Sequence, residues 1–239
     1  MPYGILYLVP TPIGNLEDIT LRALRVLKEV DSIICEDTRQ TVKLLNHFEI
    51  KKPLVSFYTY NQQRRIPGIV RDLLSGKNLA LVSDSGTPGI SDPGFFLIEE
   101  ALRSGVSVVP LPGANAALTA LIGSGLPTHG FVFLGFLRKK PGKMKKELAA
   151  AAGTGFTVIF YESPHRIRKT MAACAGIFPG KTRVVLAREL TKKFEEFTRG
   201  TLEGVNIALA AKEPLGEYVV LFNCADNAEN AGQEDEQND

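Results

Sequence analysis

The chain has 239 residues, 44% hydrophobic and 23% charged, an average globular composition that excludes collagen-like, coiled-coil and wholly disordered proteins. Its net charge of +2 is unevenly spread, because residues 226–239 hold six acids and no lysine or arginine, which leaves 28 basic against 20 acidic side chains elsewhere. This balance is typical of a protein with a polyanionic partner such as nucleic acid, and ordinary solubility charge explains it equally well.

Short apolar segments rich in β-branched residues recur along the chain and predict its strands. Most are apolar on consecutive positions, which is typical of strands buried on both faces of a sheet. They alternate with amphipathic segments, so the sequence predicts an α/β fold. The expected strands, in chain order, are Ile5–Val9, Ser32–Cys35, Leu54–Ser56, Leu79–Val82, Val106–Leu111, Phe131–Phe136, Thr157–Tyr161, Arg183–Ala187 and Tyr218–Phe222.

Helices are expected between these strands. Asp18 can cap a helix over residues 21–30, whose apolar side chains share one face while arginines and a lysine occupy the other. Residues 66–74 and 95–102 have the same amphipathic pattern.

The chain is expected to divide into two domains. An Ala- and Leu-rich helix over residues 113–126 is closed by glycines and a proline, as at a helix end followed by a linker. We therefore place a first α/β domain at residues 1–122 and a second at residues 123–225. Residues 226–239 lack apolar periodicity and are predicted to be a disordered acidic tail.

Cysteine usage and hydropathy indicate the compartment. Cys35, Cys174 and Cys224 are odd in number and far apart, which favours reduced thiols over a disulfide framework or a zinc site. We find no secretory signal, and no apolar run approaches the roughly 20 residues needed to span a bilayer. We expect a soluble, cytoplasmic protein without a membrane partner.

Residues 79–94 are the most unusual stretch, because a buried strand leads straight into a loop with three glycines and two prolines. Such a stiff loop lets the backbone approach a ligand closely, and the carboxyl end of a strand is where open α/β sheets bind small molecules. A long, well-capped turn is the alternative. Two shorter loops, Pro10–Asn15 and Pro110–Ala116, also follow strands, so the three should meet at one edge and form a cleft.

Several familiar signatures are missing. The chain contains no Gly-x-Gly-x-x-Gly, no Walker loop and no Gly-x-Ser-x-Gly, and its three histidines lack the spacing of metal ligands. Hydride transfer, P-loop hydrolysis and zinc chemistry are therefore disfavoured, and no metal site is expected.

Two further strand ends in the second half carry polar groups. Residues 160–166, FYESPHR, deliver an aromatic ring, a carboxylate, an imidazole and a guanidinium, which suits a polar ligand. Glu162 could equally cap a helix with Arg166 as its solvated partner. After the next strand, residues 187–196 repeat the pattern, although Lys193, Glu195 and Glu196 could also form a charged helix face.

Residues 138–146 place six cations in nine positions, before a helix expected to begin near Glu147. A loop of this kind suits contacts with the phosphates of a nucleic acid, which give affinity without sequence information. A solvated loop with no partner is the alternative.

Six motifs in chain order resemble the ribosomal RNA small subunit methyltransferase I family, which belongs to the tetrapyrrole-methylase-like (class III) S-adenosylmethionine methyltransferases. The resemblance runs from about residue 5 to residue 222. The motifs are PTPIGNLED (10–18), EDTR (36–39), VSDSGTPGISDPG (82–94), PG (112–113), FYESPHR (160–166) and ARELTK (187–192).

The resemblance implies two α/β domains, with S-adenosylmethionine in the cleft between them, and a homodimer. It implies 2′-O-methylation of a cytidine ribose, cytidine 1402, in the decoding region of 16S rRNA, with the small ribosomal subunit as partner. Family members commonly continue into a further C-terminal segment, where this chain has its acidic residues. By similarity the donor would contact Pro12, Asp84, Gly86, Ile90, Asp92, Asn115 and Ala116 in the first domain, and Tyr161, Leu190 and Gly216 in the second.

Methyl transfer to a ribose hydroxyl calls for a proton acceptor, and Glu162 and His165 are the candidate general bases. Glu36, Asp37 and Arg39 match a family motif without an assigned individual role, except that Arg39 could hold a phosphate. The expected RNA-binding side chains are Arg39, Arg138, Lys139, Lys140, Lys143, Lys145, Lys146 and Arg166.

Two other functions stay open at this point. A tetrapyrrole or precorrin methylase of the same fold would share the donor site but accept a small polycarboxylate. A non-catalytic RNA-binding or assembly protein could have kept the fold without the chemistry.

Overall fold

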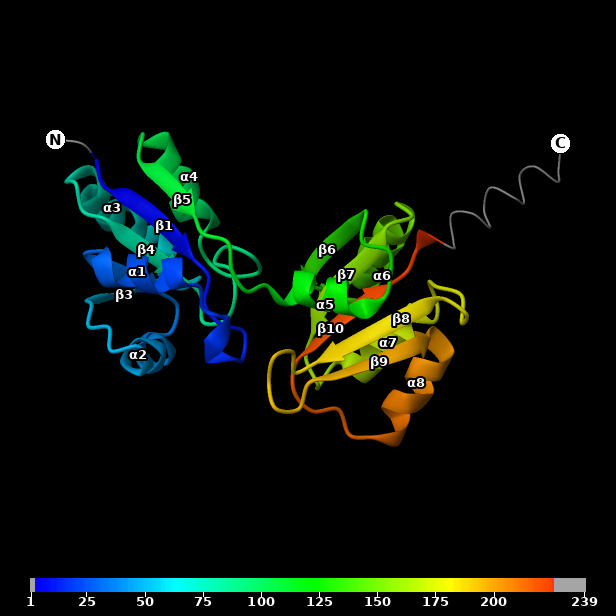
Figure 1. Cartoon of the computed structure of the whole chain (residues 1–239). Coiled ribbons are helices and arrows are strands. Elements are labelled where there is room, and N and C mark those ends of the chain that lie inside the picture. The colour runs from blue at the N-terminus through cyan, green and yellow to red at the C-terminus, as the bar shows by residue number, and fades with distance from the viewer. Residues whose placement is uncertain (1–2, 226–239) are drawn as a thin grey trace. The chain divides into compact units, whose positions relative to one another are not determined.

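The computed structural model describes residues 3–225, and these form two compact units that divide between Asn115 and Ala116 (Figure 1). Each unit has its own sheet and its own hydrophobic core. The acidic tail that we expected, residues 226–239, lies outside the described residues. Between residues 3 and 225, none of the helices has the length and apolar character that crossing a bilayer would need.

The first unit contains a five-stranded sheet in the order β3-β2-β4-β1-β5, and every neighbouring pair is parallel. Parallel pairing brings the carboxyl ends of all these strands to one edge of the sheet. The strands are β1 (Ile5–Val9), β2 (Ser32–Cys35), β3 (Leu54–Ser56), β4 (Leu79–Val82) and β5 (Ser107–Pro110).

Helices cover both faces of this sheet (Figure 1). On one face α1 (Leu21–Glu29) and α2 (Thr38–His47) pack against strand residues such as Ile33, and on the other α3 (Gln62–Leu74) and α4 (Phe95–Arg103) pack against residues such as Leu81. Burial on both faces explains why the strands are apolar on consecutive positions.

The cap of α1 differs from our expectation. Thr20, not Asp18, precedes the helix, and its hydroxyl accepts a hydrogen bond from the Ala23 amide at 3.0 Å. Asp18 instead ends a short 3-10 turn, η1 (Leu16–Asp18), so it is one turn too early to cap the helix. The sequence analysis also missed α2, which has only two buried residues, Thr41 and Leu45.

The second unit contains a mixed five-stranded sheet in the order β6-β7-β10-β8-β9, in which only β6 and β7 are parallel. Its strands are β6 (Phe131–Phe136), β7 (Thr157–Glu162), β8 (Arg183–Arg188), β9 (Glu196–Thr201) and β10 (Tyr218–Phe222). We did not predict β9, because an edge strand has only one neighbour and its sequence, EFTRGT, is largely polar.

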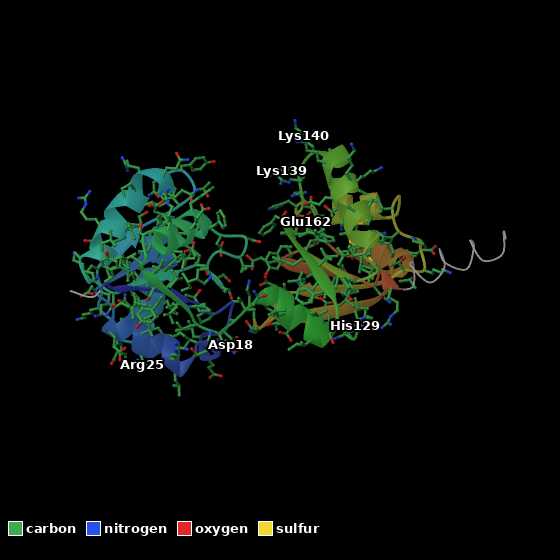
Figure 2. The ribbon with its side chains drawn as sticks, turned by 90° about the horizontal axis from the view of Figure 1, so that it is seen from above. Asp18, Arg25, His129, Lys139, Lys140 and Glu162 are labelled. Carbon is green, nitrogen blue, oxygen red and sulfur yellow. The ribbon has the colours of Figure 1, made fainter. Side chains whose placement is uncertain are left out.

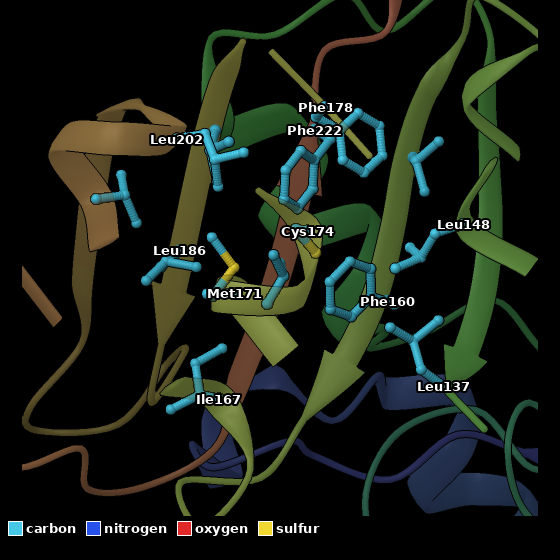
Figure 3. Close-up of a cluster of buried hydrophobic side chains, with 14 of the residues drawn as sticks. Leu137, Leu148, Phe160, Ile167, Met171, Cys174, Phe178, Leu186, Leu202 and Phe222 are labelled. Carbon is cyan, nitrogen blue, oxygen red and sulfur yellow. The ribbon is translucent and has the colours of Figure 1, made fainter. Parts of the chain in front are cut away.

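One face of this sheet carries α6 (Pro141–Ala152), α7 (Ile167–Cys174) and α8 (Leu202–Ala211), whose apolar side chains meet Phe160 and Phe222 in the core shown in Figure 3. A further helix, α5 (Ala116–Ser124), packs against β7, β8 and β10. Because α5 packs on the second sheet, the division falls before this helix, whereas we expected it after residue 122. Helix α6 begins at Pro141, earlier than the expected start near Glu147, because Pro141 occupies the first turn.

Candidate functional site

Loops that follow β1 and β4 are joined directly at the carboxyl edge of the first sheet. The Thr11 amide donates to the Gly86 carbonyl at 2.9 Å, and the Gly86 amide donates back to the Thr11 carbonyl at 3.0 Å. The buried Thr11 hydroxyl donates to the Ser83 carbonyl at 3.0 Å, and the Ser83 hydroxyl donates to the Gly86 carbonyl at 2.7 Å. These bonds fix the start of the long glycine-rich loop, residues 83–94, which joins β4 to α4.

Two more loops are tied to it. The Thr87 hydroxyl donates to the Ala114 carbonyl, after β5, at 3.0 Å. The Asp37 amide, after β2, donates to Oδ1 of Asp84 at 3.1 Å. The loops after β1, β4 and β5 therefore meet at one edge as predicted, and a fourth loop, after β2, joins them.

Glycine is required at two of these contacts. Gly86 has φ +88°, and a Cβ there would lie 3.2 Å from Cγ2 of Ile13. A Cβ on Gly113 would lie 2.6 Å from Cβ of Pro10, which is closer than two such atoms can come. The backbone of this edge is thus packed too tightly for other residues at these positions.

Three carboxylates gather at this edge, and each has a raised pKa. Burial raises the pKa of Asp92 to about 6, and the negative charges of Glu36 and Asp84 add to the effect. Burial also raises the pKa of Glu36, and the charges of Asp84 and Asp37 add to the effect. Burial raises the pKa of Asp84 as well, where the hydrogen bond from the Asp37 amide opposes the shift and the charge of Asp37 adds to it. Clustered carboxylates whose pKa values are raised by burial and by neighbouring acids are candidates for a functional site.

Asp37 behaves differently, because Arg39 neutralises it. Arg39 donates to both Asp37 oxygens, at 2.7 and 3.0 Å, and these bonds lower the pKa of Asp37 to about 2. The Arg39 side chain is 86% exposed, so it keeps a solvent-facing surface that suits its expected contact with a phosphate.

A pocket of about 320 Å³ adjoins the carboxylates in the first unit. Glu36 and Asp92 contribute its acidic wall, and the end of the glycine-rich loop supplies Ser91, Pro93 and Gly94. The remaining walls come from the segment between β3 and α3 and from the start of α4, through Thr59, Gln62, Phe95 and Phe96.

Glu162 in the second unit, one of the two expected bases, is buried, and its side chain is 1% exposed. Its Oε1 accepts a hydrogen bond from the Ser163 amide at 2.8 Å, and its Oε2 accepts one from the Thr170 hydroxyl at 2.7 Å. Arg166 lies 3.5 Å from Oε2 and also contacts the Leu137 carbonyl. Glu162 is therefore held inside the unit by Thr170 of α7 and by Arg166, whereas the start of α7 has no side-chain cap, so the expected alternative of a helix-capping acid does not describe its contacts.

The other expected base, His165, is exposed on the connection between β7 and α7. Arg166 is 29% exposed and divided between two partners, so less of it faces solvent than of Arg39.

The second-unit residues expected at the donor lie at three strand ends. Tyr161, at the end of β7, packs edge-on against Phe133 and Phe136. Leu190 is buried just after β8. Gly216, just before β10, has φ +76°, and a Cβ there would meet Cγ of Glu189 at 2.5 Å.

The basic segment, residues 138–146, is divided between a loop and the start of a helix. Arg138, Lys139 and Lys140 precede α6, whereas the other three lysines lie on its first two turns. All six side chains are exposed, and Lys139 and Lys140 project outward in Figure 2, where Glu162 lies inside the unit. The helical lysines are Lys143, Lys145 and Lys146.

Comparison with known proteins identifies the family of the chain. Residues 5–206 match the family of tetrapyrrole (corrin/porphyrin) methylases. Two relatives are named ribosomal RNA small subunit methyltransferase I: one from Halalkalibacterium halodurans, 54% identical over 84% of this chain and 69% of its own, and one from Bacillus subtilis, 51% identical over 95% and 77%. The chain belongs to this methyltransferase family. The predicted family is therefore confirmed, as is the prediction of a methyltransferase.

Two solved structures of methyl-transfer and related enzymes share the fold at low identity. Diphthine synthase matches with a TM-score of 0.71 at 16% identity, over 92% of this chain and 90% of its own. Uroporphyrin-III C-methyltransferase from Thermus thermophilus, solved in complex with S-adenosyl homocysteine, matches with a TM-score of 0.64 at 20% identity, over 92% and 98%. The predicted architecture of two α/β units is thus confirmed.

The remaining donor residues expected from the family lie along the same connected loops. Pro12 stands between the buried residues Thr11 and Ile13, and Ile90 is 42% exposed in the glycine-rich loop. Asn115 and Ala116 are half-buried at the division between the units. In residues 3–225 no three His, Cys, Asp or Glu side chains are grouped so that they could hold a metal ion.

Sequence reasoning missed the side chains that hold the methyltransferase loops together. Thr11 and Thr87 supply the hydroxyl groups that join the loops, and Thr170 supplies the one that occupies Glu162. The signal that was present in the sequence is the threonine directly after each of Pro10 and Gly86. No sequence pattern indicates that the Thr170 hydroxyl bonds to Glu162 rather than to a backbone carbonyl of its own helix.

Proposed function

We propose that the protein transfers the methyl group of S-adenosylmethionine to the ribose 2′-oxygen of a cytidine in the decoding region of 16S rRNA, cytidine 1402. The observation that carries this proposal is the 54% and 51% identity to relatives named ribosomal RNA small subunit methyltransferase I. The specific nucleotide and the 2′-O position come from the family resemblance of the motifs.

The first unit fits the donor chemically. S-adenosylmethionine carries a positive sulfonium and an ammonium, and a cation of this kind stabilises the charged forms of Glu36, Asp84 and Asp92, whose pKa values are raised mainly by burial and further by neighbouring acids. Gly86 is itself buried, and its backbone bonds to Thr11 fix the loop that carries Asp84. We assign the donor to the connected loops, with Asp84, Gly86 and Asp92 as its principal contacts and Pro12, Ile90, Asn115 and Ala116 around them. Contacts from Tyr161, Leu190 and Gly216 stay predictions.

When bound, the donor supplies an activated methyl group, so the protein's task is to orient the ribose hydroxyl and accept its proton. Glu162 does not suit the second role, because its carboxylate is buried and both oxygens already accept hydrogen bonds. His165 is the expected base whose side chain is exposed. We therefore assign proton acceptance to His165.

The RNA contacts follow from charge and exposure. Arg39 and the six cations of residues 138–146 are exposed and suit the phosphates of the rRNA. Arg166, held by Glu162 and the Leu137 carbonyl, is a weaker candidate. The homodimer and the cytoplasmic location stay predictions.

Transfer of labelled methyl groups tests the proposal. The protein is incubated with labelled donor and either purified small ribosomal subunits, naked 16S rRNA or a precorrin extract, and labelled RNA is digested to nucleosides. We expect label in 2′-O-methylcytidine from the ribosomal samples. Label only in the precorrin extract would establish the tetrapyrrole methylase instead, and donor binding without any transfer would contradict the proposal.

His165→Ala and His165→Gln, compared in single-turnover methylation assays across pH, test the assignment of the general base. Unchanged rates would remove His165 from that role.

A further inference from the structure

The segment between β3 and α3 presents aromatic and basic side chains together. Residues 58–65 read YTYNQQRR, and within them Tyr58 is 41% exposed and Tyr60 is 96% exposed. Arg64 and Arg65, in the first turn of α3, are exposed as well. Large exposed aromatic rings beside arginines are typical of surfaces that bind single-stranded nucleic acid, because bases stack on rings and phosphates pair with guanidiniums.

This segment is held in a fixed conformation by a buried amide. Asn61 is 6% exposed, and its Oδ1 accepts a hydrogen bond from the Tyr58 amide at 2.8 Å while its Nδ2 donates to the Ser56 carbonyl at 3.2 Å. Because Asn61 points inward and bonds to the backbone at Tyr58 and Ser56, it fixes the backbone that carries the two exposed tyrosines before it. A preorganised ring loses less entropy when a base stacks on it.

A second pair of exposed rings lies at the start of α4. Phe95 is 63% exposed and Phe96 is 51% exposed, and their rings meet edge to face with centroids 5.3 Å apart. Both line the pocket of about 320 Å³, together with Thr59 and Gln62 from residues 58–65. The pocket thus has two exposed aromatic side chains in its wall, and another part of its wall comes from Thr59 and Gln62, which are close in the chain to Tyr58 and Tyr60.

The pocket's chemistry selects which part of a nucleotide can enter. Its volume lies at the lower end of the range of small-ligand sites. Glu36 and Asp92 offer hydrogen-bond acceptors, and their negative charge excludes a phosphate. The amine of a cytosine and the hydroxyls of a ribose are donors and fit these acceptors. Phosphates fit the cations outside, where Arg65 lies one helical turn from Gln62.

We propose that the surface formed by residues 58–65 with Phe95 and Phe96 binds single-stranded RNA, and that its pocket receives one unstacked nucleoside. The site rests on the proposed function, because it would present the target nucleotide to the donor loops that share Asp92 with it. A protein partner is disfavoured, since the cores of protein interfaces are depleted of charged residues and this pocket has a charged wall.

Binding of a fluorescently labelled, cytidine-containing single-stranded RNA oligonucleotide tests the site. Tyr60→Ala and Phe95→Ala should each weaken binding about tenfold, because each removes a stacking platform. Tyr60→Phe and Phe95→Tyr keep the ring and should restore the affinity. Replacing Arg64 and Arg65 by glutamine should lower the slope of log affinity against log salt by about 1 to 2.

Tyr3→Ala is the matched control, since Tyr3 is 55% exposed and precedes β1, at the opposite end of the strands. Unchanged donor affinity and unchanged unfolding midpoints would exclude misfolding of the variants. If Tyr60→Ala and Phe95→Ala bind RNA and methylate subunits with the wild-type KM, the site is wrong and the proposed function stands. If wild-type protein binds the oligonucleotide through these rings but methylates no rRNA, the site stands and the proposed function is wrong.

Discussion

Both units place a carboxylate at the end of a buried strand, and the two carboxylates have opposite environments. Asp84, after β4, accepts a hydrogen bond from the Asp37 amide, and burial together with the charge of Asp37 raises its pKa. Glu162, at the end of β7, is buried and accepts hydrogen bonds at both oxygens. The first arrangement leaves negative charge for a ligand, whereas the second uses the charge to hold the fold together.

The difference arises from the segment that follows each strand. After β4 a long loop leads to α4, so the backbone turns away and leaves Asp84 beside other loops. After β7, helix α7 begins at Ile167, and its Thr170 reaches back to the carboxylate. A strand-end acid is therefore a binding group only where no helix returns to it, and substitutions at Glu162 and Asp84 test this distinction.

Glu162→Ala should have the largest effect on stability. It leaves the Thr170 hydroxyl, the Ser163 amide and Arg166 without their acceptor in a buried place, so we expect the free energy of unfolding to fall by about 3 kcal/mol. Urea denaturation followed by circular dichroism measures it. Thr170→Val, which removes one of these bonds and keeps the shape, should cost about 1 kcal/mol. A Glu162→Ala protein as stable as wild type but unable to methylate would reverse the assignment and make Glu162 a catalytic residue.

Asp84→Asn should have the converse effect, because it should weaken donor binding and leave stability nearly unchanged. The asparagine keeps an oxygen for the Asp37 amide and removes the charge, so stability should change by no more than about 0.5 kcal/mol. Donor affinity, measured by calorimetry, should fall about thirtyfold, as expected for loss of a charged hydrogen-bond partner. S-adenosylhomocysteine, which lacks the sulfonium charge, should lose less affinity than S-adenosylmethionine. Equal affinity of variant and wild type for the donor would remove Asp84 from the site.

Sequence patterns predicted the central strands well, because strands buried on both faces must be apolar throughout and glycine-rich loops mark their ends. They failed where burial is partial: the edge strand β9 and the helix α2 have too few apolar side chains to show a period. They also could not separate Asp84 from Glu162. That distinction depends on Thr170 and Arg166, whose contacts with Glu162 follow from the start and direction of α7, which local sequence does not specify.

The basic segment offers a smaller, salt-dependent effect. Replacing Lys143, Lys145 and Lys146 by glutamine removes three exposed charges from α6 while Met144 and Leu148 keep the helix packed. If each lysine neutralises a phosphate, RNA affinity should fall roughly tenfold and the slope of log affinity against log salt should become shallower by about 2 to 3. The same replacement at Lys28, Lys51 and Lys52 of the first unit is the control. An unaltered slope would make the α6 lysines ordinary solvated surface.

Asp92→Asn should have the smallest effect, and its sign depends on pH. The pKa of Asp92 is raised from 3.8 to about 6 by burial and by Glu36 and Asp84, so between these values the folded chain binds a proton that the unfolded chain releases. The stabilising contribution is therefore complete below about pH 4 and lost as the pH rises through 6. Because asparagine stays neutral, the variant should be more stable than wild type by about 1 kcal/mol at pH 7, after allowance for partial exposure, and equal to it near pH 4. Asp18→Asn, which removes a charge from an exposed turn, is the control for a general charge effect. If the two proteins unfold at the same urea concentration at both pH values, Asp92 carries no destabilised charge, and the acidic edge would not need a cationic donor to relieve it.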